Sequence, residues 1–457
     1  MDRRDFIVGT LAATGLGAAA QVDVDASEGP FACVADRVFD GQQVLRDHAV
    51  IVEGRTIAEV VPTASLPPGL RRLSLPGCTL VPGLIDVHTH FMGWEGPLFL
   101  GWGVTTVRDT GNALEWILAR RAEWQHHPWP RILCVGPLLD GPSPFHPLVS
   151  RACRDLSDAV AAVRQTAAAG VDGIKLYVGL GPEWVPHMAR ESHAAGLKVS
   201  MHCAGAGAVV AARAGVDEFH HLDGIVDAVW PGHPPGWLNL WGAPEFPGTW
   251  DRQQELADLI RESGMAATPT LAYWDSQWRV RSPGYIVSDE RCPVPPELAR
   301  LQSPGEPNAE AAEQWRRALA AAQRFTGLLL ERGVPVLTGS DTPCGPVPPG
   351  LSLWRELSLL VEAGMTPQQA LRAATLDAAD FLRRSDTGRL RPSAAADMAF
   401  VRGDPTVRLP REPEVVATIR DGTLYQHADL LAAARKAASD LEHDPWMAQF
   451  RAHAARA

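Results

Sequence analysis

The sequence predicts an α/β protein in which a (β/α)8 barrel is joined to a small β-rich module. The length of 457 residues suits one large barrel plus a smaller unit. Between residues 83 and 385, short apolar segments alternate with longer helical stretches, which is the pattern of parallel βα units. Residues 31–81 and 397–425 instead hold short β-branched segments bounded by Gly, Asp or Pro. Both ends of the chain therefore read as parts of one β-module.

The expected barrel strands follow from these apolar segments. They lie near 84–90, 103–108, 131–136, 173–178, 198–203, 217–221, 266–271 and 334–340. Helices are expected between them, for example over 365–382, where Thr366 can cap the helix and Pro367 suits its first position. An apolar stripe follows in that helix, made of Leu371, Ala374, Thr375 and Ala378. A further helix is expected in the tail from Ala428.

The N-terminus has the pattern of an export signal. Arg3-Arg4 precedes an apolar stretch rich in Ala and Gly, and three alanines at 18–20 offer a cleavage site before Gln21. This resembles a twin-arginine signal, and the alternatives are an N-terminal anchor or a chance pair of arginines. We therefore expect an exported protein, periplasmic or extracellular, that meets the twin-arginine export machinery. No other stretch reaches about 18 continuous apolar residues, so stable membrane insertion is not expected.

The predicted division of the chain has four parts. They are a signal at 1–20, the first part of the β-module at 21–82, the barrel at 83–385, and the second part of the module with a helical tail at 386–457.

Composition excludes some classes of function. The net charge of −11 argues against nucleic acid as a partner, because phosphates need basic patches. Seven cysteines without a CxxC do not predict a disulfide framework or a cysteine-ligated zinc site. Cys203 follows His202 directly, so on a strand it would point to the opposite face. The expected partner is a small-molecule substrate, and homo-oligomer formation is left open.

One segment lacks the alternation of short strands and helices. Residues 226–310 are dense in Pro, Gly and Trp, and six of the fifteen tryptophans lie between Trp230 and Trp278. Loops after barrel strands form the face that carries active sites, so this insertion either lines an apolar substrate pocket, or acts as a lid, or packs against the barrel.

The first candidate ligands stand at the end of an apolar strand, in VPGLIDVHTH. Residues i and i+2 of a strand share a face, so His88 and His90 both point to the mouth of the barrel. Two neutral imidazoles aimed at one point are suited to binding a metal.

Lys175 is unusual because it lies inside an apolar strand, in DGIKLY. A buried ammonium is costly unless it is paired. One interpretation is an ion pair with an inner carboxylate. The other is reaction with CO₂ to form a carbamate whose oxygens bridge two metals.

Three further strand ends carry ligand-type residues. His202 ends VSMH, and the pair His220-His221 ends VDEFHH. Because neighbours on a strand point to opposite faces, only one of that pair is expected to point inward. Asp341 ends VPVLTGSD, where a carboxylate can bind metal and move a proton.

The ordered set of HxH, Lys, His, His and Asp on separate strand ends resembles the amidohydrolase superfamily. The resemblance is to its binuclear subtype with a bridging carbamylated lysine, and to the branch of imidazolonepropionase-like proteins and prolidase-type dipeptidases. Matching stretches cover nearly all of the chain after the signal, including VPGLIDVHTH, GVTTVRDTG, DGIKLY, VSMHCAG, AARAGVDEFHH, TPTLAY and VPVLTGSDT. The fold that it implies is a distorted TIM barrel with a small β-sandwich formed by the N- and C-terminal segments.

The resemblance also implies roles for individual residues. His88, His90 and Asp341 would bind one divalent metal ion, and His202 and His221 the other. Carbamylated Lys175 would bridge the two ions, which are expected to be Zn²⁺. His221 is chosen over His220 on this basis, and His220 is then expected to be peripheral. His220 stands where the family often has Glu. The segment GPLLDGPSPFH, which ends at His146, also departs from the Gly-rich loop that the family has there.

The implied function is metal-dependent hydrolysis of a C–N bond in a small molecule such as a dipeptide or N-acyl amino acid. A metal-bridging hydroxide would attack the carbonyl, and Asp341 would accept a proton and return it to the leaving amine. His146, Tyr177 and Tyr273 are candidates for holding the carbonyl or a substrate terminus.

Three other functions are weighed against this one. The first is a mononuclear deaminase or cyclic-amide hydrolase, whose members commonly carry a glutamate three residues after the fourth ligand, where this chain has Gly205. The second is ester or lactone cleavage on the same site. The third is a non-catalytic binding protein that keeps the fold, since a fold alone does not prove activity.

Overall fold

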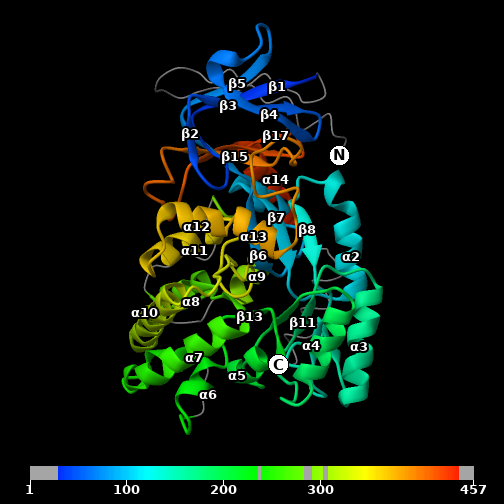
Figure 1. The fold of residues 1–457 in the computed structure, drawn as a ribbon, viewed down its shortest axis with the longest axis vertical. Coiled ribbons are helices and arrows are strands. Elements are labelled where there is room, and N and C mark those ends of the chain that lie inside the picture. The colour runs from blue at the N-terminus through cyan, green and yellow to red at the C-terminus, as the bar shows by residue number, and fades with distance from the viewer. Residues whose placement is uncertain (1–28, 235–237, 283–290, 302–306, 442–457) are drawn as a thin grey trace.

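The computed structural model describes residues 29–234, 238–282, 291–301 and 307–441. The predicted signal at 1–20 lies outside the described residues. Figure 1 shows a β-rich module at one end of the molecule and a barrel surrounded by helices beneath it.

Strands from both chain ends form the β-module. The sheet runs in the order β17-β16-β15-β5-β1-β3-β4, with β2 paired to β1. The two chain ends meet where β5 pairs in parallel with β1 and antiparallel with β15. Its apolar residues form a core of their own, separate from that of the barrel. The strands are β1 (Phe31–Phe39), β2 (Val44–Arg46), β3 (His48–Glu53), β4 (Thr56–Pro62), β5 (Arg71–Pro82), β15 (Met398–Arg402), β16 (Val415–Arg420) and β17 (Thr423–Gln426).

The barrel strands lie in two parallel sheets, β6-β7-β8 and β10-β9-β11-β12-β13-β14. The strand expected at 131–136 ends early, because the chain bends at Gly136, which has a φ of 73°, and pairing resumes in β9. The strands are β6 (Leu84–Thr89), β7 (Val104–Asp109), β8 (Arg131–Cys134), β9 (Leu138–Asp140), β10 (Ser150–Ala152), β11 (Ile174–Leu176), β12 (Val199–Met201), β13 (Glu218–His220) and β14 (Ala266–Thr268).

The eighth barrel position is an extended segment rather than a regular strand. Residues 334–342 make only isolated bridges, at Val336 with β14 and at Thr342 with β6. Pro335 accepts a hydrogen bond but has no N–H to donate, which interrupts the ladder. Backbone bonds from Leu337 to Ala267 and from Val87 to Thr338 still connect the segment to both neighbours. The barrel is thus closed but irregular, and the predicted distorted barrel with a β-rich module is confirmed.

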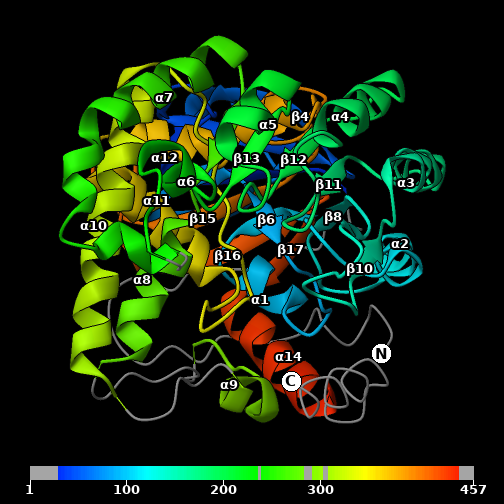
Figure 2. The same cartoon turned by 90° about the horizontal axis from the view of Figure 1, so that it is seen from below.

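Helices surround the barrel, as Figure 2 shows from below. They are α1 (Gly96–Gly101), α2 (Leu114–Glu123), α3 (Leu156–Ala168), α4 (Val185–Ala194), α5 (Ala208–Ala214), α6 (Ile225–Val229), α7 (Trp250–Ser263), α8 (Leu271–Val280), α9 (Pro296–Leu301), α10 (Ala309–Glu331), α11 (Leu351–Glu362), α12 (Pro367–Ala373), α13 (Leu376–Phe381) and α14 (His427–Asp440). The predicted tail helix is α14, which packs against α1 through Leu98 and Ala434. None of the described helices is both long and apolar enough to cross a bilayer.

The helix expected over 365–382 is present but divided. Thr366 caps α12 in a capping box with Gln369, as predicted for its start. The helix then breaks, because the carbonyl of Ala374 accepts the backbone N–H of Ile85 in β6 instead of one from its own helix. The break lets α13 pack against the first barrel strand, β6.

The tryptophans of the 226–310 segment that the structure describes pack against the barrel core. Trp241 and Trp274 are 2% and 0% exposed, and their ring centroids lie 5.7 Å apart. Trp241 lies equally close to Phe325 of α10. Trp230, Trp250 and Trp278 are partly buried against the same core. These contacts support the packing interpretation of the segment, while its role in substrate binding stays a prediction.

Candidate active site

The six predicted metal ligands gather at the carboxyl ends of the barrel strands, the face where such folds hold their active sites. His88 lies in β6 and His90 follows it, while Lys175 is in β11. His202 and His221 directly follow β12 and β13, and Asp341 lies in the closing segment. All of them are buried except His90 and His202, which are partly buried.

His88, His90 and Asp341 form a compact group, with donor atoms all within 4.8 Å of one another. Oδ1 of Asp341 lies 3.2 Å from Nε2 of His88 and 3.3 Å from Nε2 of His90. Burial raises the pKa of Asp341, but the neighbouring His221 and His90 outweigh it and hold the pKa below its usual range. Asp341 is therefore a carboxylate facing two imidazoles.

Asp86, a residue that the sequence reading missed, links the strand of His88 to the segment that carries Asp341. Its Oδ1 accepts the backbone N–H groups of His88 and Ser340, at 3.2 and 3.0 Å, and its Oδ2 accepts the Ser340 hydroxyl at 2.6 Å. Next to Ser340, a Cβ on Gly339 would lie 2.5 Å from the Cβ of His88, so only glycine allows this approach. Asp86 and Gly339 thus fix where Asp341 meets β6.

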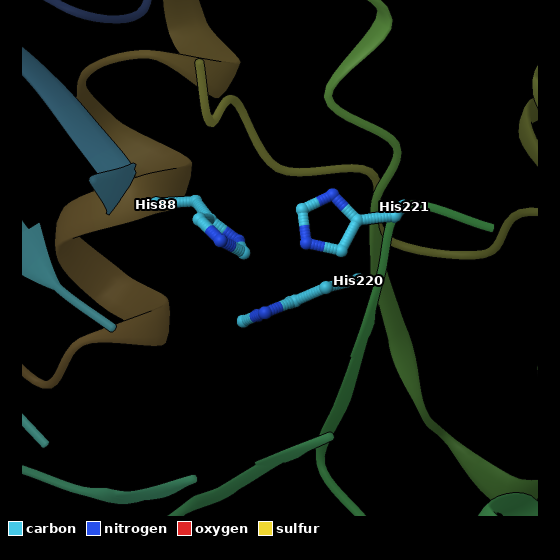
Figure 3. Close-up of side chains that lie close together, drawn as sticks. All are labelled: His88, His220 and His221. Carbon is cyan, nitrogen blue, oxygen red and sulfur yellow. The ribbon is translucent and has the colours of Figure 1, made fainter. Parts of the chain in front are cut away.

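His220 and His221 both point into the site, so the expectation that His220 is peripheral is wrong. Strand alternation fails here because His221 has a φ of 61°, which ends the strand and turns its side chain toward the same centre. The rings of His220 and His221 lie 4.2 and 4.6 Å from the ring of His88. Figure 3 shows the three imidazoles converging, and they form a second group with donor atoms within 4.8 Å.

Lys175 lies below these imidazoles and is 1% exposed. Its Nζ is hydrogen-bonded to Nδ1 of His220. Burial lowers the pKa of Lys175 to about 7, because water no longer solvates the ammonium. Burial likewise lowers the pKa of His220 to about 3. Lys175 therefore readily reaches the neutral amine form.

A buried ion pair lies on the far side of His220. Nη2 of Arg108 donates to Oε1 and Oε2 of Glu218 at 2.8 and 2.6 Å, and Nε of Arg108 donates to the carbonyl of Val87. Glu218 also accepts the hydroxyl of Thr268. Burial raises the pKa of Glu218, but Arg108 and His220 outweigh it and hold the pKa below its usual range. The sequence reading missed both charges, although Arg108 lies inside a buried strand as Lys175 does.

His202 lies at the other side of the centre. Its ring is 4.8 Å from that of His221, and its Nε2 contacts the buried carboxyl of Asp223. Burial lowers the pKa of His202 and raises that of Asp223. His202 is absent from the two compact groups described above, so the structure brings it near His221 but pairs it with Asp223.

The three candidate substrate-binding residues surround the mouth of the site. Tyr177 lies 4.9 Å from His202 and 5.8 Å from His146, and Tyr273 lies 6.5 Å from His221, measured between ring centroids. His146 is exposed, whereas Tyr177 is buried. A surface side chain and a buried hydroxyl next to the imidazoles can contact opposite ends of a small molecule.

Asp140 ties together the loops that carry His146 and Tyr177. Its Oδ1 accepts the backbone N–H of Gly179 at 2.7 Å, and its Oδ2 accepts that of Phe145 at 2.8 Å. Asp140 is fully buried at the end of β9. This carboxylate therefore positions both loops relative to the barrel.

The donor atoms of this centre suit a divalent metal ion. Imidazole nitrogens and a carboxylate oxygen are ligands that zinc takes. The Nδ1 of His88 is buried and has no hydrogen-bond partner among the residues that the structure describes. Five imidazoles, a carboxylate and an amine in a closed barrel are costly to bury unless a ligand satisfies them.

Comparison with protein families matches residues 98–426 to the amidohydrolase family and residues 31–80 to the NagA composite domain. Among curated proteins, the imidazolonepropionase of Thermoplasma acidophilum is 33% identical over 90 residues, or 16% of this chain and 22% of that protein. The imidazolonepropionase of Streptomyces avermitilis is 37% identical over 92 residues, or 19% and 21%. The chain thus spans about a fifth of the length of the curated relatives that it matches.

Solved structures match over most of the chain. A Xaa-Pro dipeptidase with bound methionine has a TM-score of 0.64 at 20% identity, covering 87% of this chain and 100% of that one. A bottromycin amidohydrolase has a TM-score of 0.68 at 23% identity, covering 90% and 92%. The ochratoxinase of A. niger has a TM-score of 0.63 at 18% identity, covering 87% and 96%. These similarities establish the fold.

Proposed function

The chain belongs to the amidohydrolase family, and from this membership we propose that it is a metal-dependent hydrolase of a C–N bond in a small molecule, such as a dipeptide or an N-acyl amino acid. The family matches agree with the resemblance to imidazolonepropionase-like and prolidase-like proteins that the motifs indicated. The comparisons support a metal-dependent hydrolase of C–N bonds, and the choice of a dipeptide or N-acyl amino acid as substrate is our proposal.

The convergence of His88, His90, His221 and Asp341 carries this proposal. These side chains come from three separate strand ends and meet in one buried centre, with Lys175 and His202 at its edges. We assign His88, His90 and Asp341 to one metal, His202 and His221 to a second, and carbamylated Lys175 to the bridge, with zinc as the metal. A bound pair of such ions lowers the pKa of a shared water and polarises a carbonyl oxygen.

Asp341 is the residue placed to move a proton. Its Oδ1 faces His88 and His90, while its Oδ2 lies 3.9 Å from Nδ1 of His221. We assign to this carboxylate the proton of the attacking water and its return to the leaving nitrogen. Tyr177, Tyr273 and His146 bind the substrate carbonyl or terminus at the mouth.

A mononuclear deaminase is disfavoured by the local packing. A Cβ at Gly205 would lie 1.8 Å from the carbonyl oxygen of Val178. The position three residues after His202 therefore has no room for the glutamate that such a reaction uses there. Ester or lactone cleavage would use the same centre, so it is an outcome that a substrate screen distinguishes.

The test is a screen of dipeptides, N-acyl amino acids, esters and lactones with metal-saturated protein, alongside the Asp341→Asn variant. We expect turnover of an amide or dipeptide, and a loss of at least about 10²-fold in the variant while its metal content stays near that of the wild type. Full activity in Asp341→Asn would contradict the role of the carboxylate. Turnover of esters alone would contradict the proposed bond class.

We also propose that the protein is exported through the twin-arginine machinery. The Arg3-Arg4 pair and the following apolar stretch support this. Cell fractionation of the wild type and an Arg3→Lys/Arg4→Lys variant tests it. Export should fail in the variant, and equal export of both would contradict the proposal.

A further inference from the structure

His220 links Lys175 to a fixed pair of charges beneath the centre. Nδ1 of His220 is hydrogen-bonded to Nζ of Lys175. On the other side of the ring, Nε2 of His220 lies 3.2 Å from Oε1 of Glu218, which Arg108 holds through two short contacts. His220 and Glu218 are both 0% exposed. These side chains therefore form one continuous buried chain.

The partners on each side determine how His220 is protonated. An ammonium on Lys175 can only donate, and with that form Nδ1 of His220 is the acceptor. The remaining N–H is then on Nε2, which lies 3.2 Å from Oε1 of Glu218 without forming a hydrogen bond to it. Nδ1 of His220 is thus engaged with Lys175, whereas Nε2 has no hydrogen-bond partner among the described residues.

We propose that His220 is a positioning residue for the amine of Lys175, held in place by Glu218 and Arg108, so that this amine is carbamylated facing the metal centre. The inference rests on the proposed function, because it concerns the bridging lysine assigned there. Glu218 is itself fixed by Thr268 and Arg108, and Arg108 is fixed to the carbonyl of Val87. The ring of His220 thus lies against a carboxylate that the barrel wall fixes.

The covalent step uses dissolved CO₂ as its co-reactant. The lone pair of the neutral Nζ of Lys175 forms a bond to the CO₂ carbon, and one C–O π pair moves onto oxygen to give the carbamate anion. The nitrogen loses one proton, which passes to water. The remaining N–H of the carbamate can still donate to His220 after that proton has passed to water. The same contact therefore orients both the amine and its product.

The test compares His220→Leu with His220→Asn in the full-length chain. Leucine removes the acceptor, whereas the asparagine amide oxygen reaches the position of Nδ1 and can accept from Lys175. His193→Leu is the matched control, because His193 of α4 also pairs with a carboxylate, Asp217 at 2.8 Å, but lies outside the site. For each protein, carbamate is measured by ¹³C NMR after exchange with ¹³C-bicarbonate, and bound zinc by elemental analysis over a titration. Circular dichroism checks folding.

We expect the wild type and His193→Leu to carry the ¹³C carbamate and two zinc ions. His220→Leu should lose the carbamate signal and bind zinc about 10–100-fold more weakly, and His220→Asn should recover most of both. Normal carbamate in His220→Leu would overturn the inference, as would loss of zinc with the carbamate retained, or no recovery in His220→Asn. Absence of carbamate in the wild type would instead overturn the proposed bridging lysine itself. If His220→Leu does not fold, the comparison of His220→Asn with the wild type decides.

Discussion

Replacing Glu218 by Gln tests the buried charge chain beneath the site. The substitution preserves the shape of the side chain but removes its charge, leaving Arg108 as an uncompensated cation that is 4% exposed. Arg108 keeps its bond to the carbonyl of Val87, yet its two contacts with the carboxylate, at 2.8 and 2.6 Å, lose their ionic character. Breaking a buried pair of this kind costs about 3–5 kcal/mol of the free energy of unfolding.

The assay is urea unfolding in the presence of a chelator, so that metal affinity does not contribute. Glu191→Gln is the matched control, because Glu191 also pairs with an arginine, Arg164 at 2.6 Å, but at the surface. The control should stay close to the wild type, since exposed ion pairs contribute little. Replacing both members, in Arg108→Met/Glu218→Leu, should recover much of the loss. If Glu218→Gln were as stable as the control, the pair would not be the buried constraint described above.

Two further predictions concern stability. Burial raises the pKa of Glu356 from 4.5 to about 8, so the folded state binds this proton more tightly than the unfolded state. The resulting contribution to the free energy of unfolding is present below pH 4.5 and is lost as the pH rises toward 8. Glu356→Gln should therefore flatten the fall in the free energy of unfolding between these pH values, and an unchanged pH profile would refute the assignment. Gly205→Ala should destabilise the protein by about 1–3 kcal/mol in denaturant unfolding, because its Cβ would overlap the carbonyl oxygen of Val178. Gly248→Ala, where nothing lies within 4 Å of the added Cβ, should have little effect, and equal losses in the two variants would contradict the packing argument.

The barrel, and the site residues at the ends of its strands, could be predicted from the sequence because both depend on local patterns. Apolar segments ending in His or Asp placed His88, His90, Lys175, His202, His221 and Asp341 on one face of the barrel, and the structure has them there. Their roles as ligands stay predictions. The β-module was predicted for the same reason, from β-branched segments at both chain ends.

Long-range contacts explain what could not be predicted. Strand alternation allowed only one of His220 and His221 to point inward, and the resemblance selected His221, whereas the positive φ of His221 brings both rings in. The helix break at Ala374 depends on a hydrogen bond to Ile85, nearly the whole barrel away in sequence. Asp86 and Arg108 carried a usable signal, since each is a charge inside a buried strand, whereas Glu218 begins β13 beside Asp217 and carried none. Asp223 lies in a turn after β13, where no such signal exists.

The most direct test of the account is anomalous X-ray diffraction at the zinc edge from crystals of the metal-saturated protein. We expect two anomalous peaks per chain, one among His88, His90 and Asp341 and the other among Lys175, His202 and His221. A single peak, a peak coordinated by His220, or no peak between these side chains would contradict it.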